Sequence, residues 1–238
     1  MRIHSFESLA TLDGDGVRYA IYLNGCPLRC VYCHNPDTWG VSGEDYSAED
    51  LFNKIKRYKP YFGQNGGVTF SGGEPLLSAH FINEVAPLLK DANINYALDT
   101  SGQVDMNEET KKAIMNSELV ILDLKFWDND SYFKYTGKTM AKTLTTLYFL
   151  NAIQKRTWIR TVIVPGINDS KEVLDKYIEI LKLYPFIEKY ELLGFHTMGF
   201  FKYENLGIDN PLKDVPEMDQ DKLKDLQNYV DSKLKNSK

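Results

Sequence analysis

The stretch Tyr22-Leu-Asn-Gly-Cys-Pro-Leu-Arg-Cys-Val-Tyr-Cys-His-Asn35 holds the only three cysteines of the chain, Cys26, Cys30 and Cys33. It continues directly from a predicted strand, Arg18–Asn24, and loops at the carboxyl ends of barrel strands are where such folds hold their active sites. Three thiolates with this Cys-x₃-Cys-x₂-Cys spacing can bind three irons of a cubane iron–sulfur cluster, which leaves the fourth iron without a protein thiolate. That iron is open to a substrate, so the stretch indicates an enzyme rather than an electron carrier.

Outward from this loop, short β-branched runs alternate with longer amphipathic stretches along the chain. Such alternation predicts parallel strands joined by right-handed crossovers. Six strands are too few for a closed eight-stranded barrel, so we expect an α/β fold, a partial (β/α)6 TIM-like barrel with an open lateral side. The predicted strands are Arg18–Asn24, Gly67–Phe70, Ile94–Asp99, Leu119–Leu124, Thr157–Val164 and Lys189–Leu193, and the predicted helices are Ser47–Tyr58, Ala79–Asp91, Asn107–Asn116, Ala141–Lys155, Lys171–Tyr184 and Glu217–Lys235.

The bulk properties suit one globular domain. The 238 residues, 43% of them apolar, contain no linker or repeat and predict a single core domain with a short N-terminal extension and a C-terminal helix. No run of about 18 apolar residues occurs, and the start Met1–Ser8 lacks the layout of a secretory signal. We therefore expect a cytoplasmic protein without a membrane partner. The net charge of −5 offers no general attraction to nucleic acid.

A structural zinc site, with His34 as the fourth ligand, is the alternative interpretation of the cysteine stretch. His34 directly follows Cys33, however, and adjacent side chains rarely reach one metal ion. Structural zinc sites also tend to use paired motifs, which this sequence lacks. A non-enzymatic zinc module therefore stays open as the less favoured hypothesis.

The cysteine spacing, with the aromatic Tyr32 before the last cysteine, resembles the hallmark of the radical S-adenosylmethionine (SAM) superfamily. Further segments, in the same order from residue 2 to about residue 200, resemble the activases of glycyl radical enzymes, and among them the type that activates pyruvate formate-lyase. These segments are Arg2-Ile-His-Ser-Phe-Glu-Ser8, Tyr32-Cys-His-Asn35, Asp37-Thr-Trp39, Gly67-Val-Thr69, Ser71-Gly-Gly-Glu74, Leu122-Asp-Leu-Lys125, Trp158-Ile-Arg160 and Val164-Pro-Gly166.

The resemblance implies a [4Fe–4S] cluster on Cys26, Cys30 and Cys33, with SAM at the open iron. One electron, delivered by a flavodoxin or a ferredoxin-type donor, would cleave the SAM sulfonium to methionine and a 5′-deoxyadenosyl radical. That radical would remove a Cα hydrogen from one glycine of pyruvate formate-lyase. The task of the protein would be to place SAM, exclude water and present one hydrogen.

The same resemblance assigns further site residues. Contacts to SAM are implied for Tyr32, Cys33, His34, Gly73, Asp123, Leu124, Lys125, Arg160 and His196, and a monovalent cation for Asp99, Thr100 and Asp123. Ordinary structural roles compete with these assignments. The glycines of Ser71-Gly-Gly-Glu74 could form a plain turn, an acid at a strand end could cap a helix, and a buried Arg160 could pair with an internal carboxylate.

The segment Asp13-Gly-Asp-Gly16 resembles the loop through which these activases meet their protein substrate. The family usually has proline where this chain has Asp15, and alanine where it has Pro75. Proline fixes φ near −65°, so we expect a less rigid loop at Asp15.

Two other enzyme classes stay open. Activases of other glycyl radical enzymes share the early motifs, yet many carry a cysteine-rich insert, and this chain has no spare cysteine. A radical SAM enzyme acting on a small molecule, such as a deazaguanine-forming synthase, would turn over without a protein partner.

Overall fold

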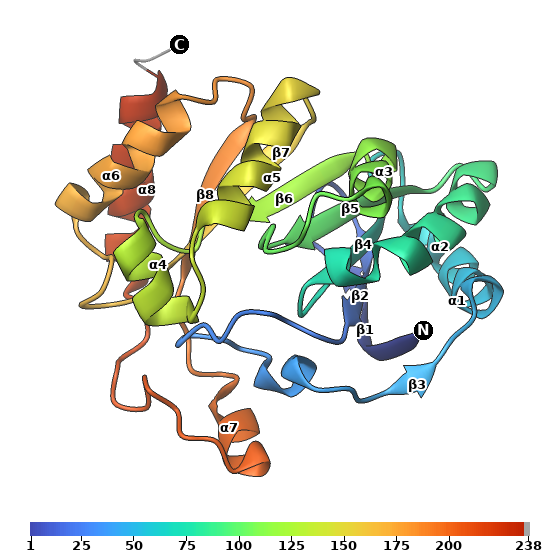
Figure 1. Cartoon of the computed structure of the whole chain (residues 1–238), viewed down its shortest axis with the longest axis horizontal. Helices are drawn as coiled ribbons and strands as arrows, with labels where there is room; N and C mark the ends of the chain where they lie inside the picture. Colours follow the sequence, from blue (N-terminus) through green and yellow to red (C-terminus); the bar gives the residue numbers. More distant parts are fainter. Residues whose placement is uncertain (236–238) are drawn as a thin grey trace.

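The computed structural model describes residues 1–235 and shows one curved sheet flanked by helices (Figure 1). The strands are β1 (Arg2–Ala10), β2 (Arg18–Leu23), β3 (Glu44–Asp45), β4 (Gly67–Gly72), β5 (Asn95–Thr100), β6 (Leu119–Asp123), β7 (Thr157–Ile163) and β8 (Lys189–Gly194). The α-helices are α1 (Ala48–Ile55), α2 (Ala79–Asp91), α3 (Glu108–Asn116), α4 (Asn129–Thr136), α5 (Ala141–Ala152), α6 (Lys171–Lys182), α7 (Phe200–Leu206) and α8 (Gln220–Lys235). Short 3₁₀ helices span Pro36–Trp39, Lys56–Tyr61 and Pro75–Ser78.

All six predicted strands form, and each is parallel to its neighbours in the order β2-β4-β5-β6-β7-β8. The sheet does not close on itself, since β8 ends the order on one side and β3 on the other. The predicted α/β partial barrel with an open side is therefore confirmed. Within residues 1–235, no helix is both long enough and apolar enough to cross a membrane.

Several elements were not predicted. β1 lies antiparallel to β2, with Ile3 opposite Leu23, and was expected only as an N-terminal extension. Its pairing contains a bulge, and Leu9 in this bulge has a φ of 62°, which breaks the alternation that identifies strands. The helices α4 and α7 are shorter than three turns, too short for a clear apolar period.

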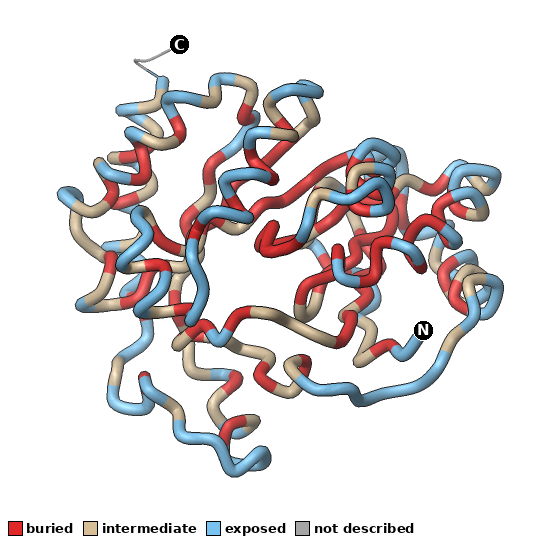
Figure 2. Tube along the Cα trace, in the orientation of Figure 1, coloured by how far each residue is buried: buried red, intermediate tan, exposed pale blue. Residues whose placement is uncertain are grey.

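The two faces of the strands carry different side chains. Phe70, Leu98 and Leu122 are fully buried beneath the helices and belong to the main apolar core. Burial of each such side chain contributes about 1.5–3 kcal/mol. A separate small apolar cluster lies on the inner face and consists of Ala97, Leu119, Ile121 and Trp158. The central strands are buried on both faces, as Figure 2 shows, so polar groups on the inner face need partners or a ligand.

The loop between β1 and β2 is anchored to β7 and to the residue that precedes it. Asp15 forms an ion pair of 2.6 Å with Arg156, which also contacts Glu188 at 2.8 Å. Arg160 on β7 donates to the main-chain carbonyl of Leu12. Proline would make this loop rigid but could not bind Arg156. The ion pair of Asp15 therefore compensates for the rigidity that the missing proline would have given.

The last strand, β8, has two main-chain groups bound by a side chain of α8. Leu192 N–H donates to Gln227 Oε1 at 2.8 Å, and Gln227 Nε2 donates to the carbonyl of Tyr190 at 3.0 Å. The amide of Gln227 thus occupies the position that a further strand would take.

Candidate functional site

A cavity of about 230 Å³ lies where the carboxyl ends of the strands meet the loop after β2. Most predicted site residues line it: Cys26, Cys30, Tyr32, Cys33, His34, Gly73, Asp99, Asp123, Lys125 and Arg160. Thr100, Leu124 and His196 do not line it. A larger hollow of about 990 Å³ between α6, β8 and α8 has none of the predicted residues in its lining. The chemistry of the lining, rather than size, identifies the smaller cavity as the candidate site.

The segment Gly25–Asn35, here called the cysteine loop, is held by main-chain hydrogen bonds to other elements. Gly25 N–H donates to the carbonyl of Thr38 at 2.8 Å. Arg29 N–H donates to Thr136 and Val31 N–H to Tyr135, at 2.8 and 3.0 Å. The last two acceptors end α4, so an unpredicted helix positions the cysteines. The sequence contained signals for both ends of this helix, Asp128 as a typical N-cap and Gly137 as a typical C-cap residue. In the structure Asp128 accepts from Ser131 N–H at 2.7 Å, and Gly137 ends the helix at a φ of 76°.

All three cysteines carry free thiols. Burial raises the pKa of each thiol, to about 11 for Cys26, while Lys125 acts in the opposite direction on all three. Metal binding must therefore displace protons from these sulfurs. No three His, Cys, Asp or Glu side chains of residues 1–235 converge on a point that would hold a single metal ion. A cubane does not need such convergence, because each thiolate binds a different iron, so this donor set fits a cluster.

Gly73 lies against the start of the cysteine loop. A Cβ at this position would approach the carbonyl oxygen of Gly25 to 2.1 Å, which no real side chain can do. The neighbouring Glu74 N–H donates to the same carbonyl at 2.7 Å. Glycine is required here by close approach, so the Ser71–Glu74 segment is more than an ordinary turn.

The carboxylate of Glu74, which sequence reasoning did not single out, is completely buried. It accepts hydrogen bonds from Thr100 Oγ1, from both N–H and Oγ of Ser101, and from Leu76 N–H. Burial raises its pKa, and these donors oppose that rise. Glu74 therefore ties the loop after β4 to the loop after β5. Glu74 lies directly before Pro75, the first residue of a 3₁₀ helix. This N-cap position was the only sequence signal that could have drawn attention to it.

Two carboxylates meet at the mouth of the barrel. Burial and then repulsion by Asp123 raise the pKa of Asp99 to about 7. Asp123 pairs with Lys125 at 2.5 Å. The hydroxyl of Thr100, predicted to bind a cation with these two acids, points to Glu74 instead. Only the main-chain carbonyl of Thr100 is left for such a role.

Arg160 is buried on the inner face of β7 and lines the cavity. Its Nε lies 2.9 Å from Glu191 Oε2 on β8, so the internal carboxylate that the sequence left open as a partner is present. Asp99 and Asp123 also interact electrostatically with this guanidinium. Arg160 therefore forms a structural ion pair with Glu191 and also presents its positive charge to the cavity. Leu124, between two of the predicted SAM residues, donates its N–H to the carbonyl of Arg160 at 2.9 Å.

Two histidines from distant parts of the chain stack on each other. The rings of His34 and His196 are 3.7 Å apart at 23°, and His34 Nε2 lies 3.1 Å from the carbonyl of His196. Burial lowers the pKa of His34 to about 4. The Nδ1 of His196 and the hydroxyl of Tyr32 are buried without a protein partner. Of these two residues, Tyr32 lines the cavity, so its free hydroxyl is placed to meet a ligand there.

The unpredicted helix α7 covers the end of the cysteine loop. Tyr203 OH donates to the carbonyl of Cys33 at 2.9 Å, and a Cβ at Gly199 would lie 2.5 Å from the carbonyl of His34. Lys202 pairs with Asp37 at 2.9 Å. The region after residue 200, where the family resemblance weakens, therefore contributes directly to the surroundings of the cysteines.

Comparison with known proteins identifies the family of the chain. A family model described as "Radical SAM superfamily" matches residues 20–178. The pyruvate formate-lyase-activating enzyme of Clostridium pasteurianum is 44% identical over 231 residues, which are 96% of each chain. The enzyme of the same name from Staphylococcus epidermidis is 40% identical over 96% of this chain and 94% of its own.

Solved structures share the fold. Streptococcus suis SuiB bound to precursor peptide SuiA superposes with a TM-score of 0.69 at 17% identity, over 91% of this chain and 46% of SuiB. The chain thus spans about half the length of SuiB. A domain of pyruvate-formate lyase-activating enzyme from Bacteroides vulgatus gives a TM-score of 0.57 at 22% identity, over 71% of this chain and 94% of that domain.

Proposed function

The chain belongs to the radical SAM superfamily and, within it, to the family of pyruvate formate-lyase-activating enzymes, and on this premise we propose that it generates the glycyl radical of pyruvate formate-lyase. The observation that carries the proposal is the set of three free thiols at the mouth of a partial barrel, beside buried polar atoms that lack a protein partner. We further propose that the enzyme works in the cytoplasm and needs neither a nucleic acid nor a membrane.

The enzyme uses a [4Fe–4S] cluster and SAM, as its superfamily does. Cys26, Cys30 and Cys33 would hold the cluster. When bound, the two groups supply one-electron cleavage of the SAM sulfonium to methionine and a 5′-deoxyadenosyl radical, which takes the glycine hydrogen. The cysteine loop keeps its three sulfurs in place through main-chain bonds to α4, which do not depend on the metal.

The remaining residues of the cavity would bind and orient SAM. Lys125 and Asp123 offer opposite charges to its carboxylate and ammonium ends, and Gly73 allows the backbone to approach the methionyl part. His196 would accept or donate at its free Nδ1 beside the nucleoside, with His34 stacked against it. Tyr32, Leu124 and Arg160 would complete the contacts.

A monovalent cation would lie beside Asp99 and Asp123. Like charges in a buried site repel, and a cation between them would offset that repulsion. The raised pKa of Asp99 supports this proposal. The main-chain carbonyl of Thr100 is the ligand that this residue could add.

The glycine loop of the partner would enter through the open side of the barrel. The loop between β1 and β2 supports this route, because Leu12 is 78% exposed while the adjacent Asp13 lines the cavity. Leu12 would contact the partner at the surface, and Asp13 would contact the part of the partner's chain that has entered the cavity. A flavodoxin or a ferredoxin-type protein would deliver the electron.

The decisive test is anaerobic incubation of the dithionite-reduced protein with SAM and pyruvate formate-lyase, followed by electron paramagnetic resonance. We expect a glycyl doublet in the wild type and none in Cys30→Ala. SAM cleavage without a protein radical would contradict the proposed substrate and favour another glycyl radical enzyme or a small molecule. A colourless, zinc-loaded protein would contradict the whole assignment.

A further inference from the structure

We propose that Arg29, Lys134 and Lys138, here called the basic patch, form the docking surface for an acidic one-electron donor protein. The proposal rests on the proposed function, because only an enzyme with a reducible cluster needs such a partner. It concerns a surface that no step of SAM binding or glycine activation uses.

Arg29 connects the surface to the cysteines. It lies between Cys26 and Cys30 in the chain and is exposed. Its guanidinium NH1 donates to the carbonyls of Cys26 and Leu28, at 2.8 and 2.7 Å. A donor that contacts Arg29 would therefore lie one residue from a cluster ligand. Electron transfer through protein weakens steeply with distance, so a donor is best placed on this part of the surface.

The two lysines flank the same point, Lys134 in the last turn of α4 and Lys138 just after the helix. Arg29 N–H donates to the carbonyl of Thr136, which lies midway between Lys134 and Lys138 in the chain. Both lysines are exposed, and Lys134 Nζ lies 4.7 Å from the centre of the Tyr135 ring. The turn at Gly137 leads from one lysine to the other. Three cations thus gather around one hydrogen bond of the cysteine loop.

None of the three cations forms an ion pair within the described chain, whereas nearby Lys142 and Lys202 pair with Asp105 and Asp37. The C-terminus of a helix favours Lys134, and Arg29 binds main-chain carbonyls and lies 4.8 Å from the centre of the Trp39 ring, but neither contact neutralises a charge. The protein as a whole carries a net charge of −5. A local positive surface on an acidic protein would attract and orient an acidic partner.

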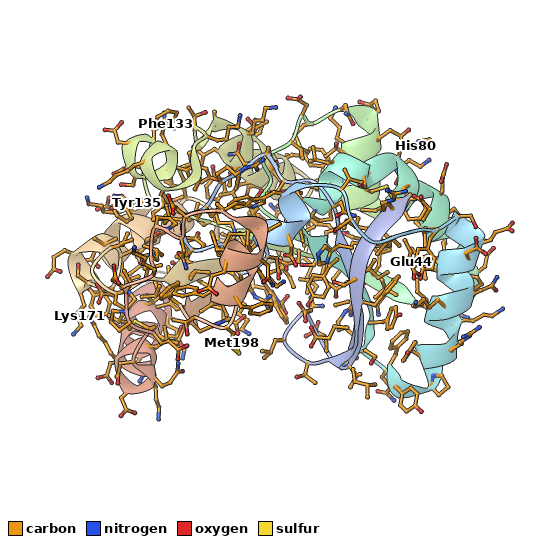
Figure 3. The ribbon with its side chains drawn as sticks, turned by 90° about the horizontal axis from the view of Figure 1, so that it is seen from below. Glu44, His80, Phe133, Tyr135, Lys171 and Met198 are labelled. Carbon is orange, nitrogen blue, oxygen red and sulfur yellow. The ribbon has the colours of Figure 1, made fainter. Side chains whose placement is uncertain are left out.

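An exposed aromatic side chain gives the basic patch an apolar neighbour. Phe133 on α4 is 61% exposed, and Figure 3 shows it and Tyr135 on different sides of the helix. Tyr135 is half-buried and stacks on Phe126 at 4.8 Å. An apolar contact surrounded by charges is the usual composition of a protein interface, and redox partners bind through small ones.

The test measures reduction of the cluster by reduced flavodoxin in stopped flow, at a series of salt concentrations. We expect the charge reversal Lys134→Glu/Lys138→Glu to lower the second-order rate constant by about tenfold or more at low salt, and less at high salt. The matched control is Lys90→Glu/Lys112→Glu, which makes the same charge change on exposed residues of α2 and α3, across the molecule from α4 (Figure 1). This control should change the rate constant less than twofold.

Reduction by dithionite separates the possible outcomes. Both double variants should cleave SAM like the wild type when dithionite is the reductant, since neither changes a site residue. Equal slowing in the two variants, or no slowing in Lys134→Glu/Lys138→Glu, would overturn the docking surface and leave the proposed function intact. Slower radical formation on pyruvate formate-lyase with dithionite would assign the basic patch to that partner and also overturn the proposal. Failure of the dithionite-reduced wild type to cleave SAM would instead reject the proposed function.

Discussion

The two ends of the barrel satisfy their polar groups to different degrees. At the amino end, the buried Arg18 donates to Thr69 Oγ1 and to the carbonyls of Asp15, Asn65 and Val68. At the carboxyl end, by contrast, the Tyr32 hydroxyl and His196 Nδ1 have no protein partner, and Asp99 has a strongly raised pKa. The protein itself therefore satisfies the buried charge of Arg18, whereas the carboxyl end presents charged and polar groups to a cavity that can hold a ligand. Barrel enzymes divide stability and function between their ends in this way.

The largest expected effect is at the carboxyl end. Cys30→Ala should abolish cluster binding and SAM cleavage, because two thiolates cannot hold a cubane with an open iron. The free energy of unfolding of the cluster-free protein should change by only about 1 kcal/mol. Iron content, SAM cleavage and urea denaturation would measure the two effects separately. Retained SAM cleavage would show that the ligand assignment is wrong.

The opposite pattern is expected at the amino end. Arg18→Met should lower the free energy of unfolding by about 2–4 kcal/mol, because four acceptors lose a buried donor. The folded fraction should still bind iron at the wild-type ratio. Urea denaturation measures the loss of stability, and iron analysis of the folded protein measures cluster binding. If a fully folded Arg18→Met variant lost its iron, the amino end would also be needed for cluster binding, against the proposed separation of roles.

The third prediction concerns the pH dependence of the carboxyl end. Because the pKa of Asp99 is raised from 3.8 to about 7, the folded chain binds a proton that the unfolded chain has released. The stability of the cluster-free protein should therefore fall as the pH rises from about 4 to about 7, by at most about 1.4 kcal/mol per pH unit. Asp99→Asn should remove this slope, as measured by urea denaturation across pH. If potassium occupies the cation site, it should stabilise the wild type more at pH 8, where Asp99 is ionised, than at pH 5. An unchanged pH slope in Asp99→Asn would assign the pH dependence of stability to another group.

The smallest effect is expected at the loop between β1 and β2. Asp15→Asn should cost about 1 kcal/mol or less, since its ion pair with Arg156 is about one-third exposed on both sides. Asp15→Pro should recover part of the loss by limiting the loop in the unfolded chain. Thermal unfolding of both variants tests this pair. A proline variant that is less stable than the asparagine variant would mean that the loop conformation excludes proline.

The parallel strands were predictable because short, mostly apolar runs alternate with amphipathic stretches, and the central strands β4 to β7 are buried on both faces. The predicted site residues Cys26, Gly73 and Asp123 meet for the same reason, since the carboxyl ends of parallel strands share one edge. Glu74 and Tyr203 could not be found in this way. Their roles depend on which loops and helices meet in space, and a single buried acid or a tyrosine in a short helix leaves no periodic signal.

The partner of the Thr100 hydroxyl was also beyond sequence reasoning. Neighbouring residues of a strand face opposite sides, so Asp99 and Thr100 cannot both direct their side chains into the barrel. The hydroxyl found its partner in Glu74, which approaches from the loop after β4. Strand alternation predicts the divergence, but only the three-dimensional packing identifies the partner.

The bonds of Gln227 to β8 restrict how any polypeptide can enter the open side. A peptide that added itself to the sheet as another strand would need the N–H of Leu192 and the carbonyl of Tyr190, and both are already occupied. An incoming loop must therefore be recognised through its side chains and its shape, and not through strand pairing at β8. The same amide protects this edge of the sheet from joining a second copy, so specificity of entry and resistance to aggregation rest on one glutamine.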